Sequence, residues 1–184
     1  ANARARFIKE AKYQAGLIHR NIVPILRMNL NDDPPSYLMP VAEATLEDDM
    51  LKDRSLGNEY VRVLMDILAG LEEMHSVGMT HRDLKPKNVL RFTDLDDETY
   101  YAIGDFGLLS VDETSVSSLT TTGMQKGTDM YTAPEIVKRL KDATPQSDIF
   151  SLGCILHDIV GTTPRIPLAE IRADGSPFAG IILR

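Results

Sequence analysis

The sequence contains no tryptophan, one cysteine and few aromatic residues, which make up 6% of its 184 positions. A single cysteine cannot form a disulfide within the chain, so the small secreted proteins that depend on disulfides are excluded. Since Cys154 falls within an apolar helical pattern, we interpret it as a small core side chain. The cysteine content therefore favours a reducing compartment and a cytoplasmic location.

Long apolar runs and an excess of positive charge are missing too. The strongest apolar run, residues 149–160, contains His157 and Asp158 and is too short to span a bilayer, so it predicts a buried helix. The net charge of −7 argues against nucleic acid as a partner, because binding to phosphate backbones needs a basic face. With 43% hydrophobic residues the chain can bury one core, and we expect a single compact unit.

The glycine-rich pattern Gly-x-Gly-x-x-Gly, which covers nucleotide phosphates in many proteins, does not occur in the sequence. Three other motifs occur in a fixed order: HRDLKPKN at residues 81–88, DFG at 105–107 and APE at 133–135. Each has an ordinary interpretation when it stands alone, since DFG is typical of a turn after a strand and APE of a helix start. Three such motifs in order are rarely coincidental, so we interpret them as one site.

The chemistry of phosphoryl transfer explains why these residue types suit one site. Transfer needs a carboxylate near the acceptor hydroxyl and oxygen ligands for Mg²⁺ beside the phosphates. Asp83 fits the first role, and Lys85 would bring positive charge toward the transferring phosphate. The amide of Asn88 and the carboxylate of Asp105 fit the metal role. The predicted catalytic residues are therefore Asp83, Lys85 and Asn88, and the predicted metal ligands are Asn88 and Asp105.

These motifs resemble those of the eukaryotic-type Ser/Thr protein kinases, and neighbouring segments extend the resemblance over most of the chain. Residues 7–11 and 17–23 resemble the family's helix C and the strand after it. Residues 71–80 resemble helix E and a short strand, and residues 147–153 resemble the start of helix F. The resemblance weakens after Thr163.

The fold that the resemblance implies is an α+β fold of the protein-kinase type, with a mostly helical large lobe and a remnant of the small-lobe sheet. One partial kinase domain would occupy residues 1–184. Residues 1–42 would be the small-lobe remnant with helix C and the hinge. Residues 43–184 would form the large lobe with the catalytic loop and the activation segment.

The ATP-orienting lysine of the family is the main element without a counterpart. The chain begins only nine residues before Glu10, which leaves no room for the glycine-rich loop or for the strand that carries the lysine. We therefore expect a fragment of a larger kinase, truncated at its N-terminal strands and C-terminal helices. By itself the fragment is expected to be weakly active or inactive.

The activity that the resemblance implies is transfer of the γ-phosphate of ATP to Ser or Thr hydroxyls of protein substrates, with ATP and Mg²⁺ as cofactors. Regulatory domains of a longer parent are further expected partners, while nucleic acid and a membrane segment in this chain are not expected. A pseudokinase or scaffold is the main alternative, because the glycine-rich loop and the lysine are absent. A small-molecule phosphotransferase of the aminoglycoside or choline type is disfavoured by the Lys85-Pro86 pair and by residues 127–135.

Nucleotide-binding roles follow from the same resemblance. Glu10 would pair with the ATP-orienting lysine, and Met39 would be the gatekeeper at the back of the adenine pocket. The backbone of the hinge, residues 40–42, would bond the base. The predicted cofactor-binding residues are Glu10, Met39, Val41, Ala42, Leu90 and Asp105, of which Leu90 would lie under the adenine.

Residues around the catalytic loop receive structural or regulatory roles from the resemblance. Asp148 would hold the catalytic-loop backbone, and Glu135 would pair with an arginine from a later helix. The predicted structural residues are His81, Phe106, Gly107, Glu135 and Asp148. The predicted residues of the activation and substrate segment are Arg82, Thr120, Thr121, Thr122 and Thr128.

A buried stack of side chains, the spine of the family, is also implied. His81 and Phe106 would be members of this stack. They would pack the catalytic loop against Gln14 and against a strand residue such as Leu26.

Hydrophobic periodicity and turn residues predict the local structure. The expected helices and strands are residues 3–17 and 59–76 as helices, and 22–28, 37–41, 89–92 and 100–103 as strands, with turns at 31–35 and 93–98. Asn58 is expected to cap the second helix and Gly78 to end it. The predicted core face of that helix comprises Val61, Leu64, Met65, Leu68, Leu71 and Met74.

The segment between DFG and APE is rich in Ser and Thr, which is typical either of a flexible polar loop or of an activation loop. We predict that replacing Thr120, Thr121 and Thr122 together by alanine lowers the transfer activity of a longer parent kinase. The physical reason is that a phosphate in this segment would pair with Arg82 and order the loop. Phosphate transfer by the triple variant and by the unchanged parent is the measurement, and equal turnover would remove the idea.

Overall fold

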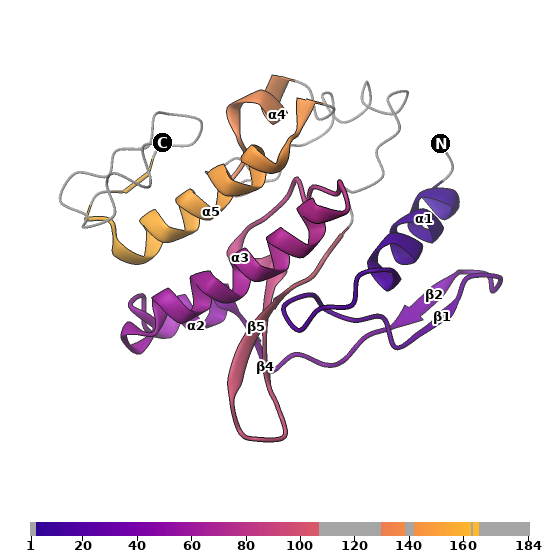
Figure 1. Ribbon diagram of the computed structural model, residues 1–184, viewed down its shortest axis with the longest axis horizontal. Helices are drawn as coiled ribbons and strands as arrows, with labels where there is room; N and C mark the ends of the chain where they lie inside the picture. The colour runs from indigo at the N-terminus through magenta and orange to yellow at the C-terminus, as the bar shows by residue number, and fades with distance from the viewer. Residues whose placement is uncertain (1–2, 107–129, 139–141, 163, 166–184) are drawn as a thin grey trace.

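A computed structural model gives the fold of this chain and describes residues 3–106, 130–138, 142–162 and 164–165. The long helix α3, Tyr60–Ser76, lies at the centre, between the β4–β5 hairpin and helix α5 (Figure 1). Helix α1 and the β1–β2 hairpin lie together on one side of it. The mixture of helices with two small sheets is the α+β arrangement expected from the sequence.

Helix α1 spans Ala3–Ala15 and ends two residues before the predicted boundary. It packs on the β1–β2 hairpin, where the ring of Phe7 stacks on the ring of Tyr37 with centroids 5.1 Å apart. Gln14 is buried at the end of the helix, and its Nε2 donates a hydrogen bond to the carbonyl of Val23 at 2.9 Å. The end of α1 is thereby fixed to the segment that follows it.

The first two strands are shorter than predicted: β1 is Arg27–Asn29 and β2 is Ser36–Leu38. They pair antiparallel across the expected turn. The predicted strand at residues 22–28 is interrupted because Pro24 has no N–H for a sheet ladder. Ile22 instead forms an isolated parallel bridge to Ile103, which joins this segment to the end of strand β5, Thr99–Ile103.

The next elements were not predicted: strand β3 at Ala44–Thr45 and helix α2 at Leu46–Lys52. Thr45 caps α2, since its hydroxyl accepts from the N–H of Asp48, while the Asp48 carboxylate accepts from the N–H of Thr45. Strand β3 pairs with β4, so this short helix is tied to the central hairpin.

The predicted cap of α3 is wrong. Asn58 lies in a 3₁₀ turn, Leu56–Asn58, with a φ of 67°, and Glu59 stands at the cap position. A left-handed backbone is a conformation that asparagine tolerates better than most residues, which explains its presence there. The predicted end of the helix fits, because Gly78 has a φ of 75° and donates its N–H to the carbonyl of His75.

Half of the predicted core face of α3 is also wrong. Val61, Met65 and Leu68 are exposed, with 53%, 60% and 38% of their surface accessible. The helix has a second apolar stripe at helical spacing, and that stripe is the one packed on β5 and α5. Its buried members are Val63, Ile67, Gly70, Leu71 and Met74.

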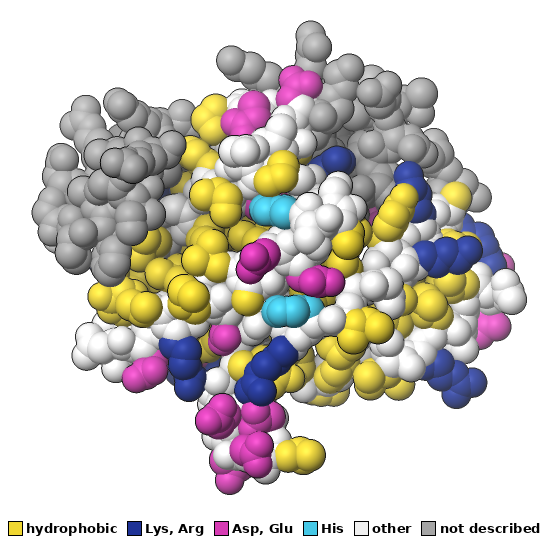
Figure 2. Space-filling model, viewed as in Figure 1, with side chains coloured by type: hydrophobic (Ala, Val, Ile, Leu, Met, Phe, Trp, Pro, Cys, Tyr) yellow, Lys and Arg dark blue, Asp and Glu magenta, His cyan; other side chains and the backbone are white. Residues whose placement is uncertain are grey.

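Strands β4, Val89–Thr93, and β5, Thr99–Ile103, form the predicted hairpin in register Val89 to Ile103. The turn between them is the expected solvated one. Asp94 accepts the backbone N–H groups of Asp96 and Glu98, and the acidic side chains gather at the lower tip of the molecule in Figure 2.

Helices α4, Pro134–Lys138, and α5, Pro145–Val160, complete the described chain. The apolar side of α5 packs with α3 in the main core, as the buried-helix interpretation of this stretch requires. Cys154 of the same helix is also buried, and burial raises the pKa of its thiol to about 11. None of the helices within the described residues has the length and apolar character needed to cross a membrane.

Two glycines in the middle of helices give a matched test of this packing. A Cβ on Gly70 of α3 would stand 2.6 Å from the carbonyl oxygen of Asn21, whereas a Cβ on Gly153 of α5 meets no heavy atom of the described chain within 4 Å. We expect Gly70→Ala to lower the free energy of unfolding by about 1–3 kcal/mol, because backbone must shift. Gly153→Ala should leave it equal or raise it by up to about 1 kcal/mol, since alanine favours helix.

Urea unfolding of the two variants and the unchanged chain measures these free energies. A Gly70→Ala chain that is as stable as the Gly153→Ala chain would contradict the close contact between α3 and Asn21.

Candidate active site

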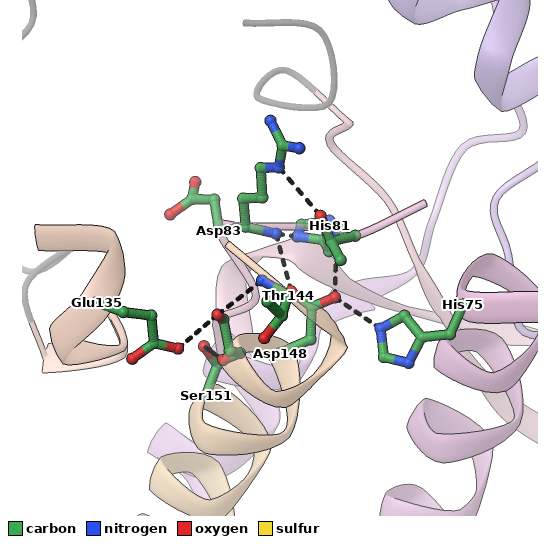
Figure 3. A network of polar contacts seen from close by, with 10 residues as sticks. His75, His81, Asp83, Glu135, Thr144, Asp148 and Ser151 are labelled. Atoms are coloured by element: carbon green, nitrogen blue, oxygen red, sulfur yellow. Dashed lines mark hydrogen bonds and ion pairs between the residues drawn. The ribbon is translucent and has the colours of Figure 1, made fainter. Parts of the chain in front are cut away.

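The loop formed by residues 81–84 is fixed by one buried carboxylate. Asp148, in the first turn of α5, accepts the backbone N–H groups of His81 and Arg82, each at 2.9 Å (Figure 3). Its Oδ2 also lies 2.8 Å from Nε2 of His75, at the end of α3. Asp148 is only 1% exposed, so these contacts are screened little by solvent.

The contact with Asp148 holds Arg82 in an unfavourable backbone conformation. Its backbone has a φ of 71°, a left-handed conformation that is costly for a residue with a long side chain. The bond from its N–H to Asp148 holds it there, and its Nε donates to the hydroxyl of Thr80 at 3.0 Å. The kink turns the Asp83 side chain away from Asp148 in Figure 3.

His81 links the loop to the segment after β5. Its ring Nε2 lies 2.9 Å from the carbonyl oxygen of Gly104, so this nitrogen carries the proton and donates. Its Nδ1 then accepts the N–H of Asp83 at 3.3 Å. The His81 ring also packs on Phe106, with centroids 5.5 Å apart, and both side chains are buried.

The expectation for Leu26 is wrong. Its side chain is 60% exposed and therefore takes no part in a buried stack. The physical reason is that the strand expected to carry it begins only at Arg27, after the interruption at Pro24.

The three predicted catalytic side chains lie together. Nζ of Lys85 is 2.6 Å from Oδ2 of Asp83, and Nδ2 of Asn88 donates to the Asp83 carbonyl at 2.8 Å. The 3₁₀ turn Pro86–Asn88 brings Asn88 back toward Asp83, and proline at its start presets the φ that this turn needs. Asp83 and Lys85 are 17% and 20% exposed, so a solute can reach them.

The residue before Asp105 contacts Asn88, because the N–H of Gly104 donates to the Asn88 carbonyl at 2.8 Å. Asp105 has a φ of 55°, and its side chain is exposed. Burial raises the pKa of Tyr37, and the negative charges of Asp105 and Glu10 raise it further. Both carboxylates therefore act electrostatically on Tyr37, although they are 95 residues apart in the sequence.

Most of the predicted adenine pocket also comes together. Met39, Ala42 and Leu90 are half-buried around a small apolar cluster that contains Val23. Val41 remains outside this cluster, with 93% of its surface exposed.

The remaining predicted residues differ in what the structure says of them. Oε1 of Glu135 accepts a 2.6 Å hydrogen bond from the hydroxyl of Ser147, next to Asp148 in α5. That partner was not foreseen, since an arginine was expected. The residues that lie outside the described chain are Gly107, Thr120, Thr121, Thr122 and Thr128.

His75 is the main contact residue that the sequence did not reveal. Its position in the last turn of α3, where a basic side chain is favoured by the helix dipole, was the available signal. That signal says nothing of Asp148, which lies 73 residues away along the chain.

The loop brings together the carboxylate of Asp83, the ammonium of Lys85 and the amide of Asn88. This combination of groups is typical of phosphotransferases. The comparisons are more specific. The family model described as the protein kinase domain matches residues 1–174. The chain belongs to this family, in its eukaryotic-type Ser/Thr class.

Curated relatives agree. The chain is 33% identical over 162 residues to the serine/threonine-protein kinase PknL of Mycobacterium tuberculosis, covering 86% of this chain and 39% of that protein. It is 34% identical over 182 residues to a probable serine/threonine-protein kinase PknB of Lactococcus lactis, covering 98% and 27%. A mitogen-activated protein kinase, mpk-1 of Caenorhabditis elegans, is 32% identical over 167 residues, covering 88% and 37%. The chain thus spans well under half the length of these relatives.

The role of Asp148 as an anchor can be tested on stability. We expect Asp148→Asn to lower the free energy of unfolding by about 3 kcal/mol, because hydrogen bonds to a buried charged group are lost and an amide N–H₂ faces backbone donors. The control is Asp97→Asn in the exposed β4–β5 turn, where the φ of 60° suits asparagine and the change should stay within about 0.5 kcal/mol. Urea unfolding of both variants is the measurement, and equal midpoints would contradict the anchor.

Proposed function

We propose that this chain is the catalytic core of a Ser/Thr protein kinase, which transfers the γ-phosphate of Mg-ATP to a hydroxyl of a protein substrate. The observation that carries the proposal is the geometry of Asp83. Its backbone is held by His81, and its carboxylate contacts Lys85 and Asn88. A fixed, partly accessible carboxylate beside an ammonium is what phosphoryl transfer requires.

The two side-chain contacts of Asp83 distinguish the roles of its two carboxylate oxygens. Lys85 at 2.6 Å and Asn88 at 3.3 Å both bind Oδ2. We assign Oδ1 to the acceptor hydroxyl, which it would orient and whose proton it would accept as the phosphate leaves ATP. Lys85 would balance negative charge on the transferring group while it holds the carboxylate.

The residues at the proposed metal position fit Mg²⁺. Nδ2 of Asn88 is turned to Asp83, so the oxygen Oδ1 is its remaining polar atom, and Asp105 adds an exposed carboxylate nearby. Within the described chain no group of three or more His, Cys, Asp or Glu side chains converges. A pair of protein oxygens suits Mg²⁺, which keeps waters and binds substrate phosphates. When bound, the ion would neutralise the phosphates of ATP.

The nucleotide would lie between the two lobes. Met39, Ala42 and Leu90 supply an apolar wall for the adenine, and the exposed residue Val41 has a backbone that could bond the base. Glu10 is our candidate for pairing with an ATP-orienting lysine, and its charge acts on the same tyrosine as that of Asp105.

The segment before APE would receive the protein substrate. Thr128 and residues 120–122 are outside the described residues. In this proposal Thr128 acts in the substrate segment, and Arg82 would bind a phosphate on one of residues 120–122. The kinked backbone of Arg82 next to Asp83 supports this, because order in the segment would then be coupled to the catalytic aspartate.

The test is transfer of labelled phosphate from Mg-ATP to a generic basic protein. It compares this chain and the full-length protein in which it occurs, each beside Asp83→Asn and beside Asp96→Asn, an exposed carboxylate of the β4–β5 turn. We expect transfer by the full-length protein, a loss of about 100-fold or more with Asp83→Asn, and no change with Asp96→Asn. Silence of every form would favour the pseudokinase, which uses the fold for binding alone.

A further inference from the structure

A buried ion pair lies at the end of α5 farthest from the catalytic loop. The guanidinium of Arg165 binds both carboxylate oxygens of Asp158, with Nε 2.7 Å from Oδ1 and Nη2 2.5 Å from Oδ2. The Arg165 side chain is only 5% exposed, and that of Asp158 is 24% exposed. Such a two-point contact fixes the orientation of the guanidinium as well as its position.

The same pair holds the segment that leads into APE. The hydroxyl of Tyr131 donates to Oδ2 of Asp158 at 2.8 Å, and the Arg165 guanidinium lies 4.7 Å from the centre of the Tyr131 ring. Arg165 also donates to the carbonyl of Met130. The backbone of Tyr131 is fixed a second time, because its carbonyl accepts the hydroxyl of Ser151 at 2.7 Å.

Helix α5 therefore connects two parts of the site. Its first turn holds the catalytic loop through Asp148, and its last turns hold Tyr131 through Asp158. A helix of 16 residues is about 24 Å long and stiff on this scale. The position of residues 130–135 relative to Asp83 thus depends on the contacts at both ends of one rigid element.

Arginine is required at the distal end for a geometric reason. One planar group here binds a carboxylate, a backbone carbonyl and an aromatic face simultaneously. Lysine has a point charge and no flat face, so it could replace only part of this set.

We propose that Arg165 is a positioning residue for the protein substrate, which sets the place of residues 130–135 by clamping Tyr131 against Asp158. The inference rests on the proposed function, in which this segment receives the substrate. Arg165 touches neither ATP nor the reacting atoms in this scheme. Removing the Arg165 side chain should therefore weaken binding of the protein substrate and leave binding of ATP unchanged.

The experiment measures KM for a generic basic protein and KM for ATP in the full-length protein. We expect Arg165→Met to raise the KM for the protein about 10-fold and to leave the KM for ATP within about 2-fold, which corresponds to roughly 1.4 kcal/mol lost in one binding step only. Arg165→Lys should give a smaller rise. Tyr131→Phe, which keeps the ring and removes the hydroxyl, should also give a smaller rise.

The control is Arg54→Met. Arg54 donates to the backbone carbonyls of Asp158 and Gly161 and so caps the same end of α5. Among the described residues, neither of these two bonds involves Tyr131. We expect it to change stability and neither KM. An Arg54 variant with the same selective rise in KM as Arg165→Met would show that helix stability is responsible and would overturn the inference.

A double variant, Asp158→Asn with Arg165→Met, removes both charges and avoids leaving Asp158 buried without its partner. Its thermal unfolding should recover toward that of the unchanged protein, while its KM for the protein substrate should stay raised. Recovery of that KM together with stability would overturn the inference. If the unchanged protein transfers no phosphate, the proposed function fails first, whereas normal transfer with an equal KM in Arg165→Met removes this inference alone.

Discussion

The buried carboxylate of Asp148 is the interaction on which the rest of the site depends. A charged group almost without solvent is tolerated only when donors replace its water, and here two backbone N–H groups and an imidazole do so. These donors belong to three consecutive parts of one sequence: the end of α3, the loop after it and the approach to Asp83. The cost of burying the charge is therefore offset only when helix, loop and α5 are all in place, which links the site to the core.

Backbone strain occurs at the same place as well as in two turns elsewhere in the described chain. Arg82, within the loop of residues 81–84, and Asp105, shortly after β5, both have left-handed backbones. Each is held by a neighbouring contact: Arg82 by Asp148, and the approach to Asp105 by the bond between Gly104 and Asn88. Strain of this kind persists where the surroundings over-determine it, and at both positions hydrogen bonds to neighbouring residues do so.

The parts of the fold that could be predicted are those with local causes. The β4–β5 hairpin, the span of α3 and the cluster of Asp83, Lys85 and Asn88 follow from short segments in which motif and turn chemistry suffice. The packed face of α3 could not be chosen, because the helix has two apolar stripes and only contacts with distant elements decide between them. The shortening of β1 followed from Pro24, a signal that was present and was outweighed by the apolar residues around it. The contact of Asp148 with the loop backbone was expected from the family resemblance alone. The contacts of Asp148 with His75, of Glu135 with Ser147 and of Asp158 with Tyr131 join side chains from different elements, which no periodicity in one sequence reveals.

The buried thiol of Cys154 has a practical consequence for studying this protein in solution. Thiol reagents attack the thiolate, and a pKa near 11 leaves almost none of the thiolate at neutral pH. Because the sequence holds no other cysteine, a single cysteine placed at an exposed position such as Leu95 would be the one group that a maleimide dye modifies. A cysteine can therefore be introduced for fluorescent labelling without first replacing Cys154.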